Sequence, residues 1–379
     1  MARKSKEEVE NQEVDSSKNT LKSLRDIISK KLKGAHVSIM SESDIASRDD
    51  YIMTPSYDLN RILTGDLLKG IYSKTLNLIV GPEHSFKSSF AALCLANAQR
   101  AGYTVIVIDT EGAWDSKFLS RWGLDPTKVL YVYTPWVDEI KTALANILEQ
   151  PGEKYAIALD SVGGIEKRKV VDDAVAGDPK QDQGGLAKEI KPLMKLYSNI
   201  IKVKNSIGIL TGHYYGSPGS YGGGDEIGGG KAVKYIPDTI ISLRKSKIYD
   251  NEKNVIGNKL TAITLKNRLY PPFNEGTIEI DFISGLNRFA GLADLAVEAG
   301  IISKGGAGWY TWINKETGEE LKVQGEAKLV KLFEENETEL IKELNSFIEK
   351  TGFSTINEEL KQAEALIVDK SSLPDSIDE

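Results

Sequence analysis

The sequence predicts an α/β fold, in which a mostly parallel, twisted sheet is flanked by helices. A helix-and-strand arm is expected before it and a small α/β unit after it. Apolar runs of strand length, such as 76–80, 103–108 and 155–159, alternate with helical stretches of ten or more residues. The first run leads into a glycine-containing turn and then a helix. The 379 residues suffice for one large or two moderate domains with a buried core.

The composition bounds the class of protein. With 40% apolar and 27% charged residues, the chain is expected to be soluble and globular. It has no run of eighteen apolar residues and no hydrophobic signal segment, so we expect a cytoplasmic protein without a membrane partner. Its single cysteine, Cys94, rules out an internal disulfide, and one cysteine with three histidines makes no zinc cluster. At a net charge of −7, binding of nucleic acid would depend on local basic segments.

The first fifty residues predict an arm ahead of the core. Residues 1–18 are polar and charged and are expected to be mobile. Apolar residues then recur at helical spacing, predicting an amphipathic helix over 19–33 that ends at Gly34; they are Leu21, Leu24, Ile27, Ile28 and Leu32. The run 36–40 is compatible with a short strand. The arm either packs on its own core or docks on a neighbouring subunit, and the sequence leaves both open.

The stretch from Leu76 to Arg100 has the layout of a P-loop, in which backbone N–H groups surround phosphates at a helix N-terminus. Lys87 would place its charge on the β- and γ-phosphates, and the Ser88 hydroxyl would ligate Mg²⁺. Phe86 stands where the motif has its second glycine, and it lacks glycine's freedom at positive φ. The alternative is an ordinary Gly-Pro turn. The strand before and the helix after favour a nucleotide site formed by Gly81, Pro82, Glu83, His84, Ser85, Phe86, Lys87, Ser88 and Ser89.

Two further strands end in carboxylates. The strand 103–108 is followed by Asp109 and Glu111, and the strand 155–159 by Asp160. Because ligands bind at the carboxyl edge of parallel sheets, these side chains are expected beside the P-loop. Asp160 is predicted to support Mg²⁺, and Glu111 to activate water for phosphate hydrolysis. The alternatives are a turn aspartate and a surface acid. Between these strands we expect a helix over 115–122, a strand over 129–133 and a helix over 138–150.

The second half predicts loops, more strands and a small terminal unit. A loop is expected over 166–185, then a helix entered near Pro192 and a strand over 207–211. The segment 214–231 is too rich in glycine for helix or strand and is expected to be a flexible loop. Further strands are predicted over 239–243, 260–265 and 277–281. Beyond 288 we expect a helix over 292–299, an aromatic strand over 309–313, a helix over 326–350 and a polar tail after 352.

His213 ends a strand beside the glycine-rich loop. Its position suggests a sensor that contacts the γ-phosphate and moves the loop, although a lone histidine is more often structural. The loop itself is either disordered or a strand-binding surface, with amides and lysines for phosphates and aromatic rings for bases. The second interpretation uses Tyr214, Tyr215, Tyr221, Lys231, Lys234 and Tyr235.

These segments, in this order and spacing, resemble the RecA recombinases. The matching stretches are 81–89, 107–113, 158–162, 228–235 and 266–268, together with 305–310 and 325–328 of the small C-terminal unit. The Ser85-Phe86-Lys87-Ser88 variant and His213 are more similar to the UvsX-type recombinases of T4-like bacteriophages. The resemblance covers the chain from the N-terminal helix to about Gly352.

The resemblance implies a RecA-like ATPase core and a filament on single-stranded DNA, which uses ATP and Mg²⁺ to pair that strand with homologous duplex DNA. It implies that Phe118 stacks on adenine near Asp115, and that Tyr235 relays the nucleotide state between subunits. Lys266 and Arg268 would reach the neighbour's γ-phosphate. The DNA-binding loops would include Gly184, Gly185, Tyr215, Gly229, Gly230, Lys231 and Lys234. A single-strand-binding protein and a recombination mediator are expected partners, and the compartment would be the host cytoplasm if the gene is phage-encoded.

We therefore predict an arm over 1–50, an ATPase core over 51–288, a small domain over 289–352 and an acidic tail over 353–379. Two alternatives remain. A ring helicase with the same core would share the P-loop and Asp160, and a DNA-coating protein with a weak ATPase would fit the unusual Phe86.

Overall fold

The computed structural model describes residues 6–32, 34–152, 154–169, 175, 185–215, 226–250 and 252–351, with only the backbone for 6–16, 214, 215 and 226. The chain separates into two units, Met1–Asp49 and Asp50–Glu379. Each is described by itself. No helix in the described ranges is long and apolar enough to cross a bilayer.

The first unit consists of helix α1 (Lys6–Lys31) and a short 3-10 turn over Met40–Glu42. Helix α1 begins at Lys6, so the predicted helix start at residue 19 is wrong, because glutamate, glutamine and lysine before it are good helix formers. The strand over 36–40 is also wrong, since that segment pairs with no strand in the described chain. The predicted apolar stripe of α1 is 40–50% exposed at Leu21, Leu24, Ile27, Ile28 and Leu32.

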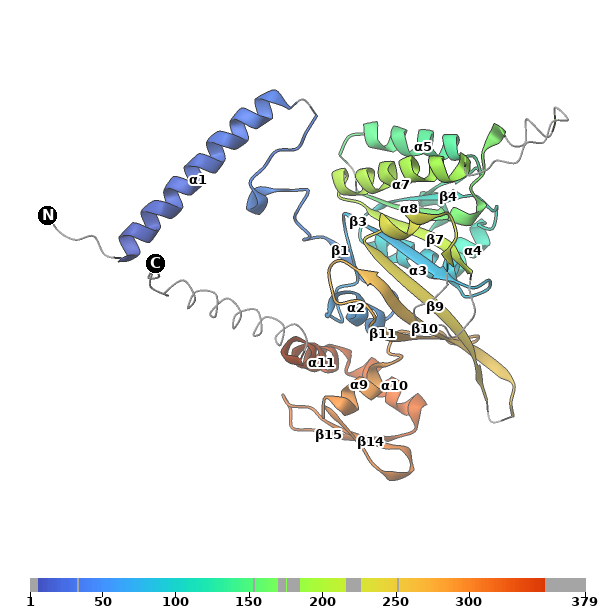
Figure 1. Ribbon diagram of the computed structural model, residues 1–379. Helices are drawn as coiled ribbons and strands as arrows, with labels where there is room; N and C mark the ends of the chain where they lie inside the picture. Colours follow the sequence, from blue (N-terminus) through green and yellow to red (C-terminus); the bar gives the residue numbers. More distant parts are fainter. Residues whose placement is uncertain are drawn as a thin grey trace, which may run out of the picture. The chain divides into compact units, whose positions relative to one another are not determined.

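The second unit is built on a large sheet with strand order β12-β11-β10-β9-β3-β7-β6-β4-β5, and β8 beside β7 (Figure 1). The neighbouring strands from β9 to β5 run parallel, and β8 and β10 to β12 pair antiparallel. This confirms the predicted mostly parallel α/β fold. The strands are β3 (Thr75–Gly81), β4 (Thr104–Asp109), β5 (Val129–Tyr133), β6 (Tyr155–Asp160), β7 (Ile207–Tyr215), β8 (Glu226–Ile227), β9 (Thr239–Tyr249), β10 (Val255–Asn267), β11 (Glu275–Asp281) and β12 (Gly285–Asn287).

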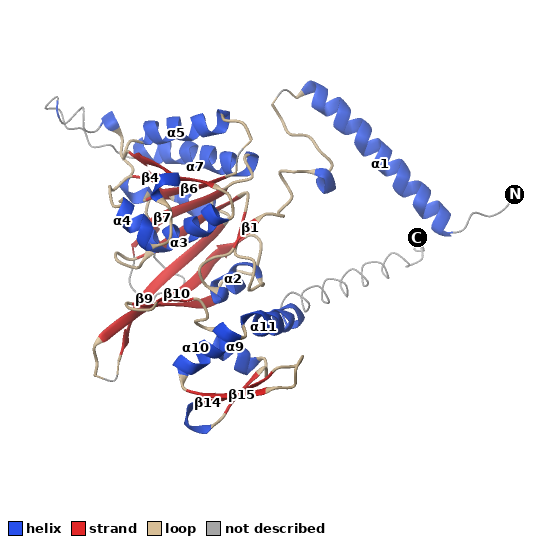
Figure 2. Cartoon of the chain, turned by 180° about the vertical axis from the view of Figure 1, so that it is seen from behind, coloured by secondary structure: helices blue, strands red, loops and turns tan. Residues whose placement is uncertain are grey.

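Helices cover both faces of this sheet (Figures 1 and 2). On one face α3 (Lys87–Arg100) packs in a cluster with Ile79, Val107 and Ala158, and α4 (Ser116–Arg121) lies at its edge. On the other face α5 (Val137–Glu149) and α7 (Gly185–Val203) pack against alternate residues of the same strands. Because both faces are buried, β3 and β6 read as continuous apolar runs, which is why the sequence revealed them.

Several boundaries differ from the sequence-based expectations. Helix α7 begins at Gly185 and carries Pro192 inside it, because its apolar face is anchored in the core by residues on both sides of the proline. Within the glycine-rich segment, β8 pairs with the end of β7 and α8 (Lys231–Tyr235) follows, so the prediction that the whole segment is loop is wrong. Residues 216–225, like 170–174 and 176–184, lie outside the described chain. Strands β9 and β10 extend beyond the core as a long ribbon. This extension was not predicted, because the strands were predicted from apolar runs and its residues include many polar ones.

The C-terminal part contains its own three-stranded sheet of β13 (Ile302–Lys304), β14 (Trp309–Ile313) and β15 (Glu320–Gln324), with α9 (Leu292–Glu298). The single helix expected over 326–350 is wrong: α10 (Glu326–Glu335) and α11 (Glu337–Thr351) are separated at Asn336, whose φ of −125° leaves the helical region. Tyr57 and Leu67 join this cluster around Trp312. The predicted tail over 353–379 lies outside the described residues.

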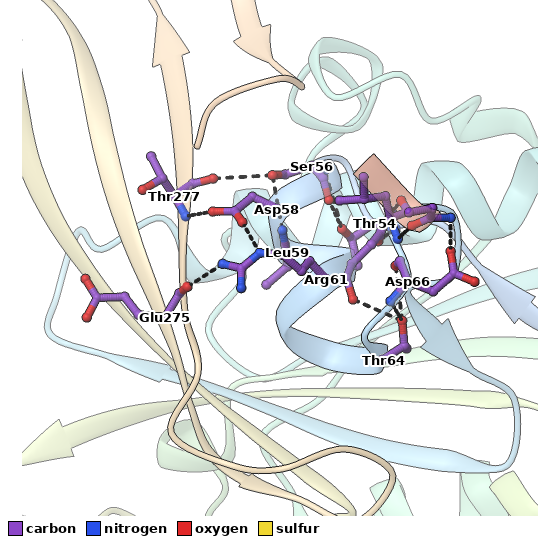
Figure 3. Close-up of polar contacts among 12 residues, drawn as sticks. Thr54, Ser56, Asp58, Leu59, Arg61, Thr64, Asp66, Glu275 and Thr277 are labelled. Carbon is purple, nitrogen blue, oxygen red and sulfur yellow. Dashed lines mark hydrogen bonds and ion pairs between the residues drawn. The ribbon is translucent and has the colours of Figure 1, made fainter. Parts of the chain in front are cut away.

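Helix α2 (Tyr57–Thr64) is joined to the edge of the large sheet by a polar network (Figure 3). The Asp58 carboxylate accepts from the Thr277 amide at 2.7 Å and pairs with Arg61 at 2.6 Å. Arg61 in turn donates to the Glu275 carbonyl at 2.8 Å. The hydroxyl of Ser56 caps α2 and also donates to the Thr277 carbonyl. Because Asp58 is buried, these partners fix α2 on β11; the small sheet of β1 (Tyr51–Ile52) and β2 (Ile71–Tyr72) flanks this helix in sequence.

Candidate active site

The parallel register brings the predicted chemical residues to one edge of the sheet. Gly81 at the end of β3 is aligned with His213 on β7, and Asp109 at the end of β4 is aligned with Asp160 at the end of β6. Glu111 follows two residues after Asp109. The P-loop, both carboxylate-bearing turns and the histidine therefore share the carboxyl edge, where open α/β sheets bind ligands.

The P-loop adopts its turn without the second glycine. Phe86 precedes α3 with φ 74° and ψ 14°, a left-handed conformation that costs a non-glycine residue about 1–2 kcal/mol. Its ring meets Trp122 edge to face, with centroids 5.0 Å apart, and such aromatic pairs contribute about 0.5–1.5 kcal/mol. Packing against Trp122 thus offsets most of the backbone strain of the left-handed turn at Phe86. His84 is also left-handed, at φ 57°.

Lys87 is buried at the start of α3 and points back into the loop. Its Nζ donates to the carbonyl oxygens of Gly81 at 3.1 Å and Pro82 at 2.7 Å. Burial lowers the pKa of Lys87, and the carboxylates of Asp160, Glu111 and Glu83 oppose that shift. A buried cation held only by two neutral carbonyls, among the described residues, is suited to an anionic ligand.

The rest of the loop fits a phosphate chain. The Ser85 hydroxyl is buried and has no hydrogen-bond partner in the described part of the chain, so it is a polar atom available to a ligand. Ser88 and Ser89 lie half-buried in the first turn of α3, and Pro82, Glu83 and His84 are exposed. The first turn of a helix presents unpaired N–H groups, which favour phosphate oxygens.

Asp160 is buried, and both of its carboxylate oxygens are already hydrogen-bonded. Oδ2 accepts from the Trp114 indole N–H at 2.7 Å, and Oδ1 accepts from the Thr211 hydroxyl. Among the described residues, no group of three or more His, Cys, Asp or Glu side chains is arranged to hold a metal ion by itself. One carboxylate and the Ser88 hydroxyl are the kind of sparse oxygen set that suits Mg²⁺, an ion that keeps several waters and binds with substrate phosphates.

Glu111 lies beside Ser161 and His213 at the open side of this edge. The Ser161 hydroxyl donates to Glu111 Oε1, and His213 Nε2 is 3.6 Å from the same oxygen. Ser161 is held by Thr110, whose hydroxyl exchanges hydrogen bonds of 2.9 Å with its backbone N–H and carbonyl. A half-exposed carboxylate so oriented can accept a proton from water. Ser161 was missed from the sequence, although its place next to Asp160 was a signal.

The turn that carries Glu111 is organised by Asp109. Its carboxylate is fully buried and accepts from the backbone N–H groups of Glu111 (3.0 Å), Gly112 (2.8 Å) and Trp114 (3.0 Å). The Tyr131 hydroxyl donates to the same carboxylate at 2.9 Å. Asp109 thus fixes the position of Glu111 rather than facing the ligand edge.

The residues predicted to contact the base lie on α4. Asp115 caps this helix, its Oδ1 accepting from the Phe118 N–H at 2.7 Å. The half-buried ring of Phe118 lies between Trp114 and Trp122, at centroid distances of 5.1 and 6.5 Å. Both residues are at the same side of the sheet as the P-loop helix, and their contact with adenine stays a prediction.

Lys266 and Arg268 lie away from the carboxyl edge. Lys266 is paired with Ile240 on β9, which aligns with Leu78 in the middle of β3. The nearby pair Thr239 and Asn77 is separated from Gly81 by four residues of strand, roughly 13 Å. Arg268 is ion-paired with the buried Asp238 at 3.1 Å. These cations are therefore remote from the P-loop of their own chain.

The predicted DNA-contacting residues flank α8. Gly229, Gly230, Lys231 and Lys234 are exposed around its start, with positive φ at both glycines, and Tyr235 at its end is 65% exposed. Gly185 begins α7, and the backbone of Tyr215 ends β7. Gly184 lies outside the described residues.

A mostly parallel sheet whose strand β3 leads through a P-loop into helix α3 is typical of the class of P-loop α/β proteins. The chain belongs to the RecA family, because the family model described as the RecA N-terminal domain matches residues 20–287. It is 30% identical to Protein RecA of Saccharopolyspora erythraea over 266 residues, 68% of this chain and 72% of the relative. The same identity holds for Protein RecA of a Nocardioides species over 249 residues, 64% and 68% of the two chains. The Recombination and repair protein of Enterobacteria phage T4 is 25% identical over 308 residues, 79% and 78%.

Proposed function

We propose that this chain is an ATP-hydrolysing recombinase, which forms helical filaments on single-stranded DNA and promotes homologous pairing and strand exchange with duplex DNA. The observation that carries the proposal is the separation of the predicted ATP-site residues along the sheet. The P-loop and Glu111 lie at the carboxyl edge, whereas Lys266 lies level with the middle of β3 and Arg268 pairs with Asp238 beside the start of β3. Chains stacked head to tail would bring the two groups of residues to one nucleotide, and such an interface gives an open helix when it does not close.

The names of the relatives support the recombination part of the proposal. Two are RecA proteins and one is a recombination and repair protein, and the matches cover about two thirds or more of this chain. The protein would then work in the cytoplasm, with a single-strand-binding protein and a mediator as partners, and in a host cell if it is phage-encoded.

The site chemistry follows from the residues at the carboxyl edge. Lys87 would replace its two carbonyl partners by phosphate oxygens. Glu111, oriented by Ser161, would take a proton from the water that attacks the γ-phosphate. Mg²⁺ bound with ATP neutralises charge on the phosphates, and Ser88 and Asp160 are the residues that would hold it or its waters.

DNA binding is proposed for the surface around α8. Lys231 and Lys234 are exposed beside Gly229 and Gly230, so backbone amides and lysines are available to phosphates despite the net charge of −7. His213 Nε2 lies 3.6 Å from Glu111 near the end of β7, and β8, just before α8, pairs with that end of β7. A γ-phosphate contact at His213 would change the DNA affinity of the surface around α8, and hydrolysis would reverse that change. The affinity for DNA should fall as salt rises.

Strand exchange with the purified protein tests the proposal most directly. Wild type should exchange strands with ATP and form extended helices by electron microscopy, whereas closed six-membered rings would favour a helicase. Glu111→Gln should bind ATP and DNA but lose turnover. Glu149→Gln, at the exposed end of α5, is the matched control and should keep it. Phosphate release that DNA does not stimulate, and that Lys87→Ala leaves unchanged, would instead indicate a DNA-coating protein.

A further inference from the structure

Four aromatic rings form a continuous row along the P-loop side of the sheet. Phe86 meets Trp122, Trp122 meets Phe118, and Phe118 meets Trp114, with centroid distances of 5.0, 6.5 and 5.1 Å. Each contact is edge to face, at 84°, 74° and 72°. We call this set the aromatic row. Its members pack on one hydrophobic cluster, and Trp114 is the most deeply buried of them, at 5% exposure.

One end of the aromatic row is Phe86, which is itself part of the P-loop. Phe86 keeps its left-handed backbone at the start of α3, where the next residue is Lys87. Trp122 is the ring that packs against it, and its indole N–H has no hydrogen-bond partner among the described residues. The Trp122 side chain is therefore held by packing on the hydrophobic cluster, and its two ring neighbours are part of that packing.

The other end of the aromatic row holds Asp160. The Trp114 indole donates to Asp160 Oδ2 at 2.7 Å, while its backbone N–H donates to Asp109 Oδ2 at 3.0 Å. Trp114 thus bridges the ends of the adjacent strands β4 and β6, whose terminal residues Asp109 and Asp160 are aligned. A hydrogen bond from a neutral donor to a buried carboxylate orients it and stabilises its charge.

We propose that Trp114 is a positioning residue for Asp160, and that the aromatic row couples this carboxylate to the corner of the P-loop at Phe86. Displacement of Phe86 when phosphate enters the loop shifts Trp122 and Phe118, and Trp114 then changes its hydrogen bond to Asp160. The inference rests on the proposed nucleotide site. It adds a path of ring contacts by which the P-loop and the Asp160 carboxylate act together.

The first test measures the Mg²⁺ dependence of binding of a fluorescent, non-hydrolysable ATP analogue. Trp114→Phe keeps a ring against Phe118 but removes the donor to Asp160. The half-saturating Mg²⁺ concentration should rise about tenfold, as expected for loss of a hydrogen bond to a charged group. Affinity for the analogue in excess EDTA should change less than about twofold, since the P-loop contacts remain.

Trp312→Phe is the matched control, because Trp312 is also buried but its indole N–H is unpartnered in the described chain, and it packs in the hydrophobic cluster of the C-terminal three-stranded sheet. It should leave the Mg²⁺ dependence unchanged even if it lowers the unfolding temperature. Failure of the wild type to bind the analogue would refute the nucleotide site itself. Wild-type binding with an unaltered Mg²⁺ dependence in Trp114→Phe would refute the positioning role alone.

A double-mutant cycle tests the coupling through the aromatic row. Trp122→Leu removes one of the two inner rings and should raise the half-saturating Mg²⁺ concentration several-fold in the wild-type background. In the Trp114→Phe background the same change should have little further effect, because the hydrogen bond that it would disturb is already gone. Additive effects would overturn the coupling. If Trp122→Leu does not fold, Trp122→Phe provides the same cycle with a smaller perturbation.

Discussion

Lys266 is hydrogen-bonded to Tyr235: its Nζ lies 2.7 Å from the main-chain oxygen of the last residue of α8, and 2.6 Å from that of Pro237. Partial burial lowers the pKa of Lys266, and Arg268 nearby acts in the same direction. The cation predicted to act on a neighbour thus also anchors the helix that carries the predicted relay residue. In a filament, Lys266 would exchange the carbonyl oxygens of Tyr235 and Pro237 for phosphate oxygens, and this exchange would release α8.

Lys266→Ala should leave ATP binding by the dilute monomer within about twofold of wild type, because Lys266 lies level with the middle of β3 and the P-loop follows its end. It should abolish the stimulation of hydrolysis by single-stranded DNA, since the neighbour's phosphate loses its cation. Phosphate release with and without DNA measures this. Lys259→Ala, an exposed lysine of the same strand, is the control. Equal stimulation in Lys266→Ala and wild type would rule out action on a neighbour.

Asp109→Asn should lower turnover at least about tenfold without removing any residue that faces the ligand, because the loop that places Glu111 loses acceptors for its N–H groups. The free energy of unfolding should fall by about 1–3 kcal/mol. Steady-state phosphate release and chemical denaturation give the two values. Asp125→Asn removes a similar turn acceptor, for Thr127, away from the site and should leave turnover unchanged. Full turnover in Asp109→Asn would show that the turn keeps its shape without this carboxylate.

The Tyr131 hydroxyl should lose its proton at a higher pH than an ordinary tyrosine. Partial desolvation of this half-exposed side chain, followed by the hydrogen bond to the Asp109 carboxylate, raises the pKa of Tyr131 from 10.0 to about 12. Because the folded-state pKa is above the unfolded value, the stabilising contribution is complete below pH 10 and is lost as the pH rises through about 12. The difference between ultraviolet titrations of wild type and Tyr131→Phe isolates this group from the other tyrosines. A difference curve centred at the ordinary value near 10 would contradict the contact with Asp109.

Asp58→Asn should destabilise the second unit by about 3 kcal/mol, because it leaves Arg61 without its charge partner in a buried network. Denaturant unfolding followed by circular dichroism measures the change. Asp138→Asn is the matched control: its carboxylate is 79% exposed and 3.7 Å from Lys141, so less than about 0.5 kcal/mol is expected. Similar values for the two variants would mean that α2 is held on β11 by apolar packing alone.

Much of the architecture could be predicted because the relevant patterns are local. The strand predicted over 129–133 is confirmed with the same bounds, and the bounds of β3, β4 and β6 differ from the predicted ones by no more than one residue at either end. The errors arose where tertiary contacts override local signals. Helix α7 continues through Pro192 because its apolar face is buried on both sides of it, and β8 forms because β7 offers a partner.

The candidate site was predictable only in part, for the same reason. The phosphate loop, Glu111 and Asp160 each follow the end of a strand, and the carboxyl ends of parallel strands lie at the same edge of the sheet. Trp114, Ser161 and Thr211, which orient those carboxylates, carry no motif of their own. Their roles depend on which strands are neighbours and on the register between them.

The amino-acid sequence by itself determined the α/β alternation, the phosphate loop and the carboxylates that follow the strands. Each of these features depends only on residues that are close to one another in the sequence. Only the tertiary structure decided that the Trp114 indole lies against Asp160, 46 positions away, and that Lys266 is bound to the carbonyl of Tyr235. Strand order and register set these contacts. They are properties of the whole sheet, and burial of its two faces selects them.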